Sequence, residues 1–335
     1  MIFTVQYFFL SLQTKNQETK EMRKVIGIGE TVLDIIFRDN QPIGAYPGGS
    51  TFNAIISLGR SGVDTTFISE TGADRVGNNI ISFLQENGVH ADHVYQYPDT
   101  KSPLSLAFLN ERNDAEYVFY KDHPHDQIDF DYPEVHADDI VLFGSYYALN
   151  PVIRQQVYGF LQYAHEQGAI LYYDVNFRAA HANDAVKLRS NLLENLELST
   201  IVRGSHEDFQ VLYKQDDPDV LYRQEISFYC KNFICTRGEA PIALRAQGDI
   251  ARSYEVERVE AVSTIGAGDN FNAGFIFGLI RERITRAQLE HGIAAEQWDR
   301  LIAYGQQFSA ACCKSIFNYI SPEEGKRMND LDFRK

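Results

Sequence analysis

The sequence predicts an α/β protein with a doubly wound, mostly parallel central sheet, helices on both faces and a small β lid. From Lys24 onward, short runs rich in β-branched residues alternate with stretches of helical periodicity, the pattern of βαβ units around a parallel sheet. Two hairpin-like segments interrupt this alternation and supply the lid. The chain has 335 residues, 44% of them hydrophobic, so it can bury one large core.

The strands expected in the central sheet are apolar runs bounded by polar residues or glycine. They cover residues 24–29, 65–70, 139–144, 169–175, 199–204 and 232–236. Helical patterns cover residues 49–61, 75–87, 151–167, 184–196 and 218–231. Because parallel neighbours need a crossover that packs on the sheet, these helices are expected to cover both of its faces. No repeat and no Pro/Gly/Ser-rich linker divides the chain, which favours one main domain.

Two segments combine apolar strand patterns with turn-forming pairs. "LDIIFRDNQPIGAYPGG" (33–49) carries Asp39-Asn40, and "SPLSLAFLNERNDAEYVFYKD" (102–122) carries Asn113-Asp114. Asn and Asp tolerate the left-handed backbone that tight hairpin turns require. We therefore expect two antiparallel ribbons that project from the main sheet as a lid, over the segments 33–48 and 95–122.

Charge and cysteine content argue against several classes of partner. The formal net charge is −15 and the basic residues are scattered, which argues against binding to nucleic acid or to an anionic membrane. The four cysteines lack the spacing of a zinc site. Reduced thiols in a cytoplasmic protein are the simplest interpretation.

The first 21 residues do not have the composition of a targeting segment. Their apolar stretch has no basic flank, is interrupted by Thr4 and Gln6, and is too short to span a bilayer. "MRKVIGIGE", from Met22, begins like the first strand of a domain. We expect Met22 to be the biological start, residues 1–21 to be a disordered or spurious leader, and the folded domain to cover residues 22–335.

The most informative stretch is "STIGAGDNFNAGFIFGL" (263–279), in which a turn of small residues leads into an apolar helix. The backbone amides of Gly266, Ala267 and Gly268 can converge with the helix N-terminus into a hole for an anion, such as a phosphoryl group in transfer. Asp269 then stands where a carboxylate could accept a proton from an attacking hydroxyl. Taken alone, Asp269 is equally compatible with a helix N-cap.

A second glycine turn, "YPGGSTFNAIISLGRSG" (46–62), also precedes a helix. Gly49, Asn53 and Asp34 are predicted to face the crevice at the carboxyl ends of the strands, where doubly wound proteins bind ligands. Short polar side chains there suit a polyhydroxylated substrate. The alternatives are an ordinary capped helix start and, for Asp34, a turn residue at the edge of a strand.

These two motifs resemble the signatures of the ribokinase-like sugar kinase (PfkB) family, and the likeness extends from Lys24 to near the C-terminus. The resemblance implies an ATP- and Mg²⁺-dependent carbohydrate kinase, closest to the fructokinase-like members. It assigns Asp269 as the general base. It also implies that the amides of Gly266, Ala267 and Gly268 stabilise the transferred γ-phosphoryl group.

The resemblance further implies two sets of binding residues. The sugar hydroxyls are expected to be held at Asp34, Gly48, Gly49 and Asn53. The nucleotide is expected to border Thr236 and Gly238, in "CTRGEAPIAL" (235–244), together with Gly266 and Gly268. Arg178, in "DVNFR" (174–178), is expected to contact the substrate or a phosphate, with a surface ion pair as the alternative.

Two departures limit what the resemblance implies. The family's Asn-x-x-Glu element, which organises the water shell of Mg²⁺, aligns with "GSHE" (204–207), so Glu207 is kept while Gly204 replaces the amide. Glu207 is therefore the candidate metal residue, acting through water. "CCKSIFNYISP" lacks the small-residue turn usual near the adenine and the monovalent-cation site, so the resemblance does not imply activation by potassium, which stays open.

The sequence thus favours phosphorylation of a primary hydroxyl of a small, fructose-like sugar. A 2-keto-3-deoxygluconate kinase stays open, because Arg178 and Lys121 could meet a carboxylate, and so does a ribose or nucleoside kinase. A catalytically silent sugar sensor on the same fold is the alternative from another class. The apolar ribbon "LSLAFL" (104–109) also favours a homodimer through the lid.

Overall fold

The structure is a computed structural model that describes residues 23–109, 115–121 and 131–333. The expected leader, Met22 and the turn at Asn113-Asp114 lie outside these residues. Within the described part of the chain, no helix is both long and apolar enough to cross a membrane.

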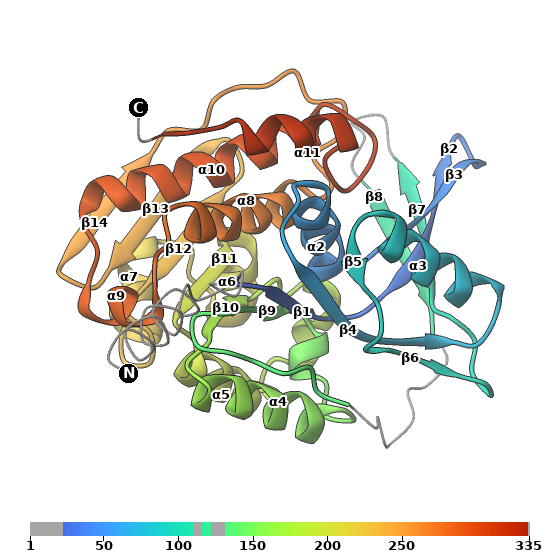
Figure 1. Cartoon of the computed structure of the whole chain (residues 1–335), viewed down its shortest axis with the longest axis horizontal. Coiled ribbons are helices and arrows are strands. Elements are labelled where there is room, and N and C mark those ends of the chain that lie inside the picture. The colour runs from blue at the N-terminus through green and yellow to red at the C-terminus, as the bar shows by residue number, and fades with distance from the viewer. Residues whose placement is uncertain (1–22, 110–114, 122–130, 334–335) are drawn as a thin grey trace, which may run out of the picture.

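The central sheet confirms the predicted doubly wound architecture (Figure 1). Its strands are β1 (Val25–Ile28), β4 (Thr65–Gly72), β5 (Val89–His90), β6 (Val94–Tyr97), β9 (Ile140–Gly144), β10 (Ile170–Asp174), β11 (Ile201–Ser205), β12 (Phe233–Arg237), β13 (Ala240–Ala246) and β14 (Ile250–Tyr254). They lie in the order β14-β13-β12-β11-β10-β9-β1-β4-β5, and β6 pairs with the second half of β4. Pairs from β12 across to β5 are parallel, whereas β13 and β14 join antiparallel. The sheet is therefore mostly parallel.

Helices cover both faces of this sheet, each over its own apolar core. One face carries α2 (Ser50–Arg60), α3 (Arg75–Glu86), α8 (Ala267–Arg281), α9 (Arg286–His291), α10 (Ala295–Cys313) and α11 (Pro322–Asn329). The other carries α4 (Arg154–Glu166), α5 (Arg189–Leu198), α6 (His206–Tyr213) and α7 (Pro218–Leu221). Residues 270–279 of α8 are all buried, because α2, α10 and the sheet surround it; an apolar helix without a polar face is the expected sequence for such a position.

The lid is a separate sheet of four strands, β2 (Val32–Arg38), β3 (Gln41–Gly48), β7 (Leu104–Leu109) and β8 (Ala115–Tyr120), in the order β3-β2-β7-β8. Figure 1 shows it projecting beside β4 and α3. Asp39 and Asn40 both have positive φ, 51° and 60°, as predicted for the first hairpin turn. The expected lid segment 95–122 begins too early, because β6 pairs with β4 and so belongs to the main sheet.

The helices predicted from the sequence do not include α6, α9, α10 or α11. Further differences lie at irregular elements. The helix predicted over 218–231 is α7 followed by a π-helical turn at Tyr222–Ile226, and residues Ala179–Asp184 form a 3-10 helix before α5. The predicted strands also do not include β5, β13 or β14. The two residues of β5 are too few to show a period, and β14 does not bury alternate residues.

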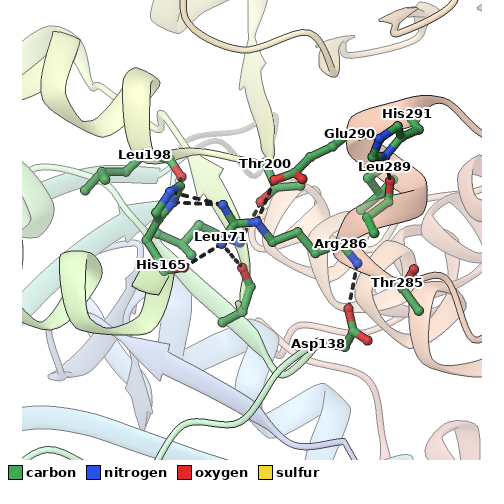
Figure 2. A network of polar contacts seen from close by, with 12 residues as sticks. Asp138, His165, Leu171, Leu198, Thr200, Thr285, Arg286, Leu289, Glu290 and His291 are labelled. Carbon is green, nitrogen blue, oxygen red and sulfur yellow. Dashed lines mark hydrogen bonds and ion pairs between the residues drawn. The ribbon is translucent and has the colours of Figure 1, made fainter. Parts of the chain in front are cut away.

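Arg286 joins the short helix α9 to α4 at the amino ends of the strands (Figure 2). Its guanidinium donates to the carbonyl oxygen of His165 at 2.6 Å and to Glu290 Oε1 at 2.7 Å, and Nη2 lies 3.0 Å from His165 Nε2. Its backbone N–H donates to Asp138 Oδ1 at 2.7 Å. A helix of six residues has little stability of its own, so these contacts hold α9 in place.

Replacing Arg286 with Met is expected to lower the free energy of unfolding by about 1.5–3 kcal/mol, the range for hydrogen bonds that involve a charged group. Urea unfolding measures this loss. Glu290→Gln is the matched control, because it weakens an i,i+4 pair whose carboxylate is 48% exposed, and such pairs are worth about 0.3–0.5 kcal/mol. Equal losses in the two variants would show that the carbonyl contacts of Arg286 contribute nothing.

Candidate active site

A cleft of about 1230 Å³ opens at the carboxyl ends of the central strands, between the β11–β12 region and helices α8 and α10. This is the edge of the sheet at which doubly wound proteins bind ligands. Among the residues that line the cleft are Arg178, Glu207, Thr236, Gly238, Gly268 and Asp269. The fold therefore gathers most of the predicted nucleotide-side and catalytic residues along one surface.

The N-terminus of α8 forms the tight turn that the sequence predicted. Gly266 is its N-cap with φ 78°, and a Cβ there would lie 2.5 Å from the carbonyl oxygen of Asn318, so glycine is required. The amide of Ala267 donates to the carbonyl oxygen of Thr264 at 3.2 Å. No hydrogen bond among the described residues uses the amide of Gly268. Gly268, in the first turn of α8, is thus the amide best placed to meet an anion.

Asp269 follows directly and does not cap the helix, because α8 has no side-chain cap. Its Oδ2 instead accepts a hydrogen bond of 2.8 Å from Asn53 Nδ2, which joins the two glycine motifs across 216 residues of sequence. Burial raises the pKa of Asp269 to about 7; the bond from Asn53 opposes this rise, and the charge of Asp174 adds to it. A carboxylate with this pKa can exchange a proton near neutral pH.

Asp34 lies on lid strand β2. It is only 7% exposed, and its Oδ2 accepts from Asn318 Nδ2 at 3.2 Å. Burial raises its pKa to about 6, although Ser105 and Arg178 oppose the rise. Asp34 is not among the residues that line the cleft, and neither are Gly48, Gly49 and Asn53, but Asp34 interacts with Arg178, which does line it.

Gly48 and Gly49 are placed as the sequence predicted, at the end of β3 and the start of α2. Gly48 lies directly against the carboxylate of Asp34. Gly49 is the N-cap of α2, with φ 133°, and its carbonyl oxygen accepts from the amide of Asn53 at 2.8 Å. Neither Ser50 nor Thr51 caps this helix with its side chain, so the glycine turn is not an ordinary capped helix start.

A buried polar network lies beneath the turn at Gly266. Arg203 donates to Asp174 Oδ1 at 2.8 Å and to Thr236 Oγ1 at 2.7 Å. Asp174 also accepts from Asn272 Nδ2 at 2.8 Å. The guanidinium lies so near Gly268 that a Cβ there would be 2.9 Å from Nη2. Although burial lowers the pKa of Arg203, Asp174 raises it further, so the guanidinium stays charged.

At the expected metal element, Glu207 is exposed and lines the cleft. Gly204 has no room for an amide side chain, because a Cβ there would lie 2.5 Å from the ring of Phe209. An Asn-x-x-Glu pair has the spacing of a capping box, and that geometry is taken one position later by Ser205 and Asp208. Glu207 is therefore left as the carboxylate that faces the cleft at this element.

Charged side chains from four elements surround the position of Asp34. Lys121, after β8, forms an ion pair with Glu30, after β1. Arg178 and Glu30 both act on the charge of Asp34, and His181 stacks on Tyr146 with ring centroids 4.1 Å apart. Glu30 and Arg178 therefore have opposite effects on the charge of Asp34, and Lys121 is paired with Glu30.

The match to known proteins decides the family. Residues 22–317 match the pfkB family carbohydrate kinases. The chain belongs to this family. It is therefore a sugar kinase of the pfkB family, as the resemblance of its two glycine motifs predicted.

Its relatives within the pfkB family are named as kinases of different sugars. The chain is 24% identical to a probable chloroplastic fructokinase-6 of Arabidopsis thaliana over 307 residues, which are 88% of this chain and 77% of that protein. It is 28% identical to a 5-dehydro-2-deoxygluconokinase of Geobacillus kaustophilus over 265 residues, 75% and 77% of the two chains.

Solved structures of pfkB-type kinases confirm the fold. A fructokinase of Vibrio cholerae O395, in a form with fructose, ADP and calcium ion bound, has a TM-score of 0.76 at 20% identity and covers 89% of this chain and 94% of its own. An aminoimidazole riboside kinase of Salmonella enterica, complexed with aminoimidazole riboside and an ATP analog, also reaches 0.76 at 20% identity, over 92% and 99%.

The sequence analysis did not identify two residues that the structure of this pfkB protein places at the site, Arg203 and Asn318. Arg203 had a usable signal, because it interrupts the apolar strand "STIVRG" (199–204) and a buried charge needs a partner. Asn318 had none, since its contacts are with residues 34, 266 and 270, far away in the sequence.

Proposed function

We propose that this protein transfers the γ-phosphoryl group of ATP to a primary hydroxyl of a small neutral sugar, with D-fructose as the first candidate. The observation that carries the proposal is the position of Asp269. Asp269 follows Gly268 in the first turn of α8, both residues line the cleft, and the carboxylate of Asp269 is hydrogen-bonded to Asn53. A hydroxyl bound near Asn53 and Asp34 would thus meet both a base and an anion hole.

The proposed step is an in-line displacement. As the sugar oxygen forms a bond to the γ-phosphorus, the bond from that phosphorus to the bridging oxygen of ADP breaks. The proton of the sugar hydroxyl passes to Asp269. The amide of Gly268 and the positive end of α8 stabilise negative charge on the transferred group. The lid sheet, which carries Asp34, excludes water from the reacting atoms.

The cleft fits a nucleoside triphosphate with its metal. Thr236 and Gly238 border its wall together with Glu207, and the described residues hold no group of three or more His, Cys, Asp or Glu that could bind a metal without phosphate. Mg²⁺ keeps several waters and needs only one or two protein carboxylates besides phosphate oxygens, so Glu207 would hold it, through water. When bound, Mg²⁺ neutralises charge on the β- and γ-phosphate oxygens.

The lid supports a neutral polyol as the acceptor. Register across the lid sheet aligns Tyr46, Asp34, Ser105 and Phe119 on one face, so an aromatic ring stands on the same face as the buried carboxylate. Glu30 neutralises Lys121. A sugar without a carboxylate needs no unpaired cation, whereas a sugar acid would have to compete with Glu30 for Lys121.

A panel of acceptors in a coupled ADP-release assay tests the proposal. With ATP and Mg²⁺, D-fructose is expected to give the highest kcat/KM among D-fructose, D-ribose, a nucleoside, 2-keto-3-deoxygluconate and 5-dehydro-2-deoxygluconate. Binding of sugars without ADP release from any of them would identify a sugar sensor instead, and would contradict the proposed function.

A 5-dehydro-2-deoxygluconate kinase is the second candidate. Relatives with that activity in their names are as similar to this chain as the fructokinase is, and Arg178 lines the cleft. Its cation could meet the substrate carboxylate. A higher kcat/KM for this acid than for D-fructose would favour it.

We further propose that the protein forms a homodimer through the outer face of the lid and acts in the cytoplasm. That face is mostly apolar and carries Leu33, Ile35, Phe37, Leu104, Leu106, Phe108, Val118 and Tyr120, together with the exposed Glu116 opposite Phe108. Val118 and Tyr120 are 40% and 57% exposed, as expected of a surface that a partner covers. The four cysteines are free and buried, which suits a reducing compartment. Sedimentation of the protein as a monomer at micromolar concentration would contradict the dimer.

A further inference from the structure

The segment 317–320, between α10 and α11, touches both halves of the candidate active site. On the lid side, the ring of Phe317 packs edge-on against Tyr46, with centroids 4.9 Å apart. On the helix side, the backbone N–H of Ile320 donates to Ser57 Oγ at 3.2 Å, and Ser57 Oγ donates to Asn270 Oδ1 at 2.6 Å. The segment therefore bridges the lid, the second half of α2 and the start of α8.

Asn318 is the centre of this bridge. Its Nδ2 donates to Asp34 Oδ2 at 3.2 Å, and its carbonyl oxygen accepts from Asn270 Nδ2 at 2.8 Å. That same carbonyl lies against Gly266. An ionised carboxylate can only accept hydrogen bonds, so the side-chain amide must turn its NH₂ group toward Asp34. One residue thus contacts the carboxylate on the lid through its side chain and the phosphoryl-transfer turn through its backbone.

We propose that Asn318 is a positioning residue, which holds the carboxylate of Asp34 toward the sugar while its backbone fixes the turn at Gly266. The inference rests on the proposed kinase function and goes beyond it, because it assigns to the C-terminal segment the coupling between the sugar-binding and phosphoryl-transfer halves of the site. Loss of the Asn318 side chain leaves the backbone contacts in place and removes only the bond to Asp34. The substitution should therefore weaken the binding of the sugar and leave the binding of ATP unchanged.

The ionisation of Asp34 provides a readout that a merely structural role would not change. The groups that face Asp34 are Glu30, Ser105, Arg178, Asn318 and Tyr319. Burial already raises the pKa of Asp34 to about 6. The Asn318 N–H group stabilises the ionised form, so its removal raises that pKa further. Because Asp269 titrates near pH 7 and affects kcat, the readout is the KM for D-fructose. Its increase at acid pH, as Asp34 is protonated, should begin at higher pH in the variant.

The experiment compares wild type with Asn318→Ala, using D-fructose and ATP in the ADP-release assay across a range of pH. Asn318→Ala is expected to raise the KM for D-fructose by about tenfold or more, the scale of a lost hydrogen bond to a charged group. The KM for ATP should change by less than about twofold, a shift too small to represent one lost hydrogen bond. Ile316→Ala, an exposed change in the adjoining loop, is the matched control and should leave both KM values and the pH profile unchanged.

Asn318→Asp is the second variant and keeps the size of the side chain, so it serves if Asn318→Ala does not fold. Two adjacent carboxylates cannot both ionise easily. Its kcat/KM for D-fructose should therefore be low at neutral pH and recover in part at higher pH. Equal changes in both KM values, or an unchanged pH dependence of the KM for D-fructose in both variants, would overturn the role of Asn318 alone. If wild type releases no ADP with any sugar, the proposed function fails first and this inference with it.

Discussion

Replacing Asp269 with Asn is expected to lower kcat by about two to four orders of magnitude, the range for loss of a positioned general base. The amide keeps the size of the carboxylate but cannot accept the proton of the sugar hydroxyl. The side-chain oxygen of the new Asn can still accept the hydrogen bond from Asn53, which is 2.8 Å long in the wild type. The binding of D-fructose and of ATP should therefore be largely retained. Single-turnover kinetics and calorimetric titration separate these two effects.

The same assignment predicts how kcat of the wild type depends on pH. Burial raises the pKa of Asp269 to about 7, and only the ionised form acts as a base. In wild type, kcat should therefore fall about tenfold per pH unit below about pH 7 and level off above it. In Asp269→Asn this limb should disappear, since the titrating group is gone.

The matched control is Glu296→Gln, which makes the same chemical change in the first turn of α10 at an exposed position. It should leave kcat and its pH profile unchanged. An Asp269→Asn enzyme with near-normal turnover would show that Asp269 is not the base. A residual acid limb at the same pH would assign the titration to another group, with Asp34 as the first candidate because its pKa is about 6.

The parts of the candidate site that could be predicted are those whose backbone conformation follows from a few consecutive residues. The turn 266–268 and the start of α2 each combine glycine with a helix start, and that combination is visible within a few residues. The same holds for the first lid hairpin, where Asp39 and Asn40 occupy left-handed turn positions. The backbone conformations that Gly, Asn and Asp favour therefore predicted the two glycine turns and the first lid hairpin.

The sequence could not decide what holds those halves together. Whether Asp269 caps its helix or faces the cleft depends on Asn53, which lies 216 positions away. The place of β6 depended on β4, with which it pairs, and not on its own four residues. Contacts between distant segments have no local period, so residues such as Asn318 became visible only in the folded chain.

Replacing Arg203 with Met is expected to lower the free energy of unfolding by about 3–5 kcal/mol, because it leaves the carboxylate of Asp174 buried without an opposite charge, although the hydrogen bond from Asn272 stays. The two side chains are only 7% and 4% exposed. Urea unfolding measures the loss. Arg327→Met breaks an exposed ion pair with Glu324, in which the side chains are 45% and 28% exposed. It should cost less than about 1 kcal/mol.

A second substitution separates the stability of this network from its role in the site. Adding Asp174→Asn to Arg203→Met removes the unpaired buried charge, so part of the lost stability should return. The guanidinium that holds Thr236 and lies under Gly268 is still absent, so kcat should stay low. If kcat recovered together with stability, Arg203 would only serve to neutralise Asp174. Low kcat in a restabilised double variant would instead show that its contacts position the wall of the nucleotide cleft and the amide that meets the transferred phosphoryl group.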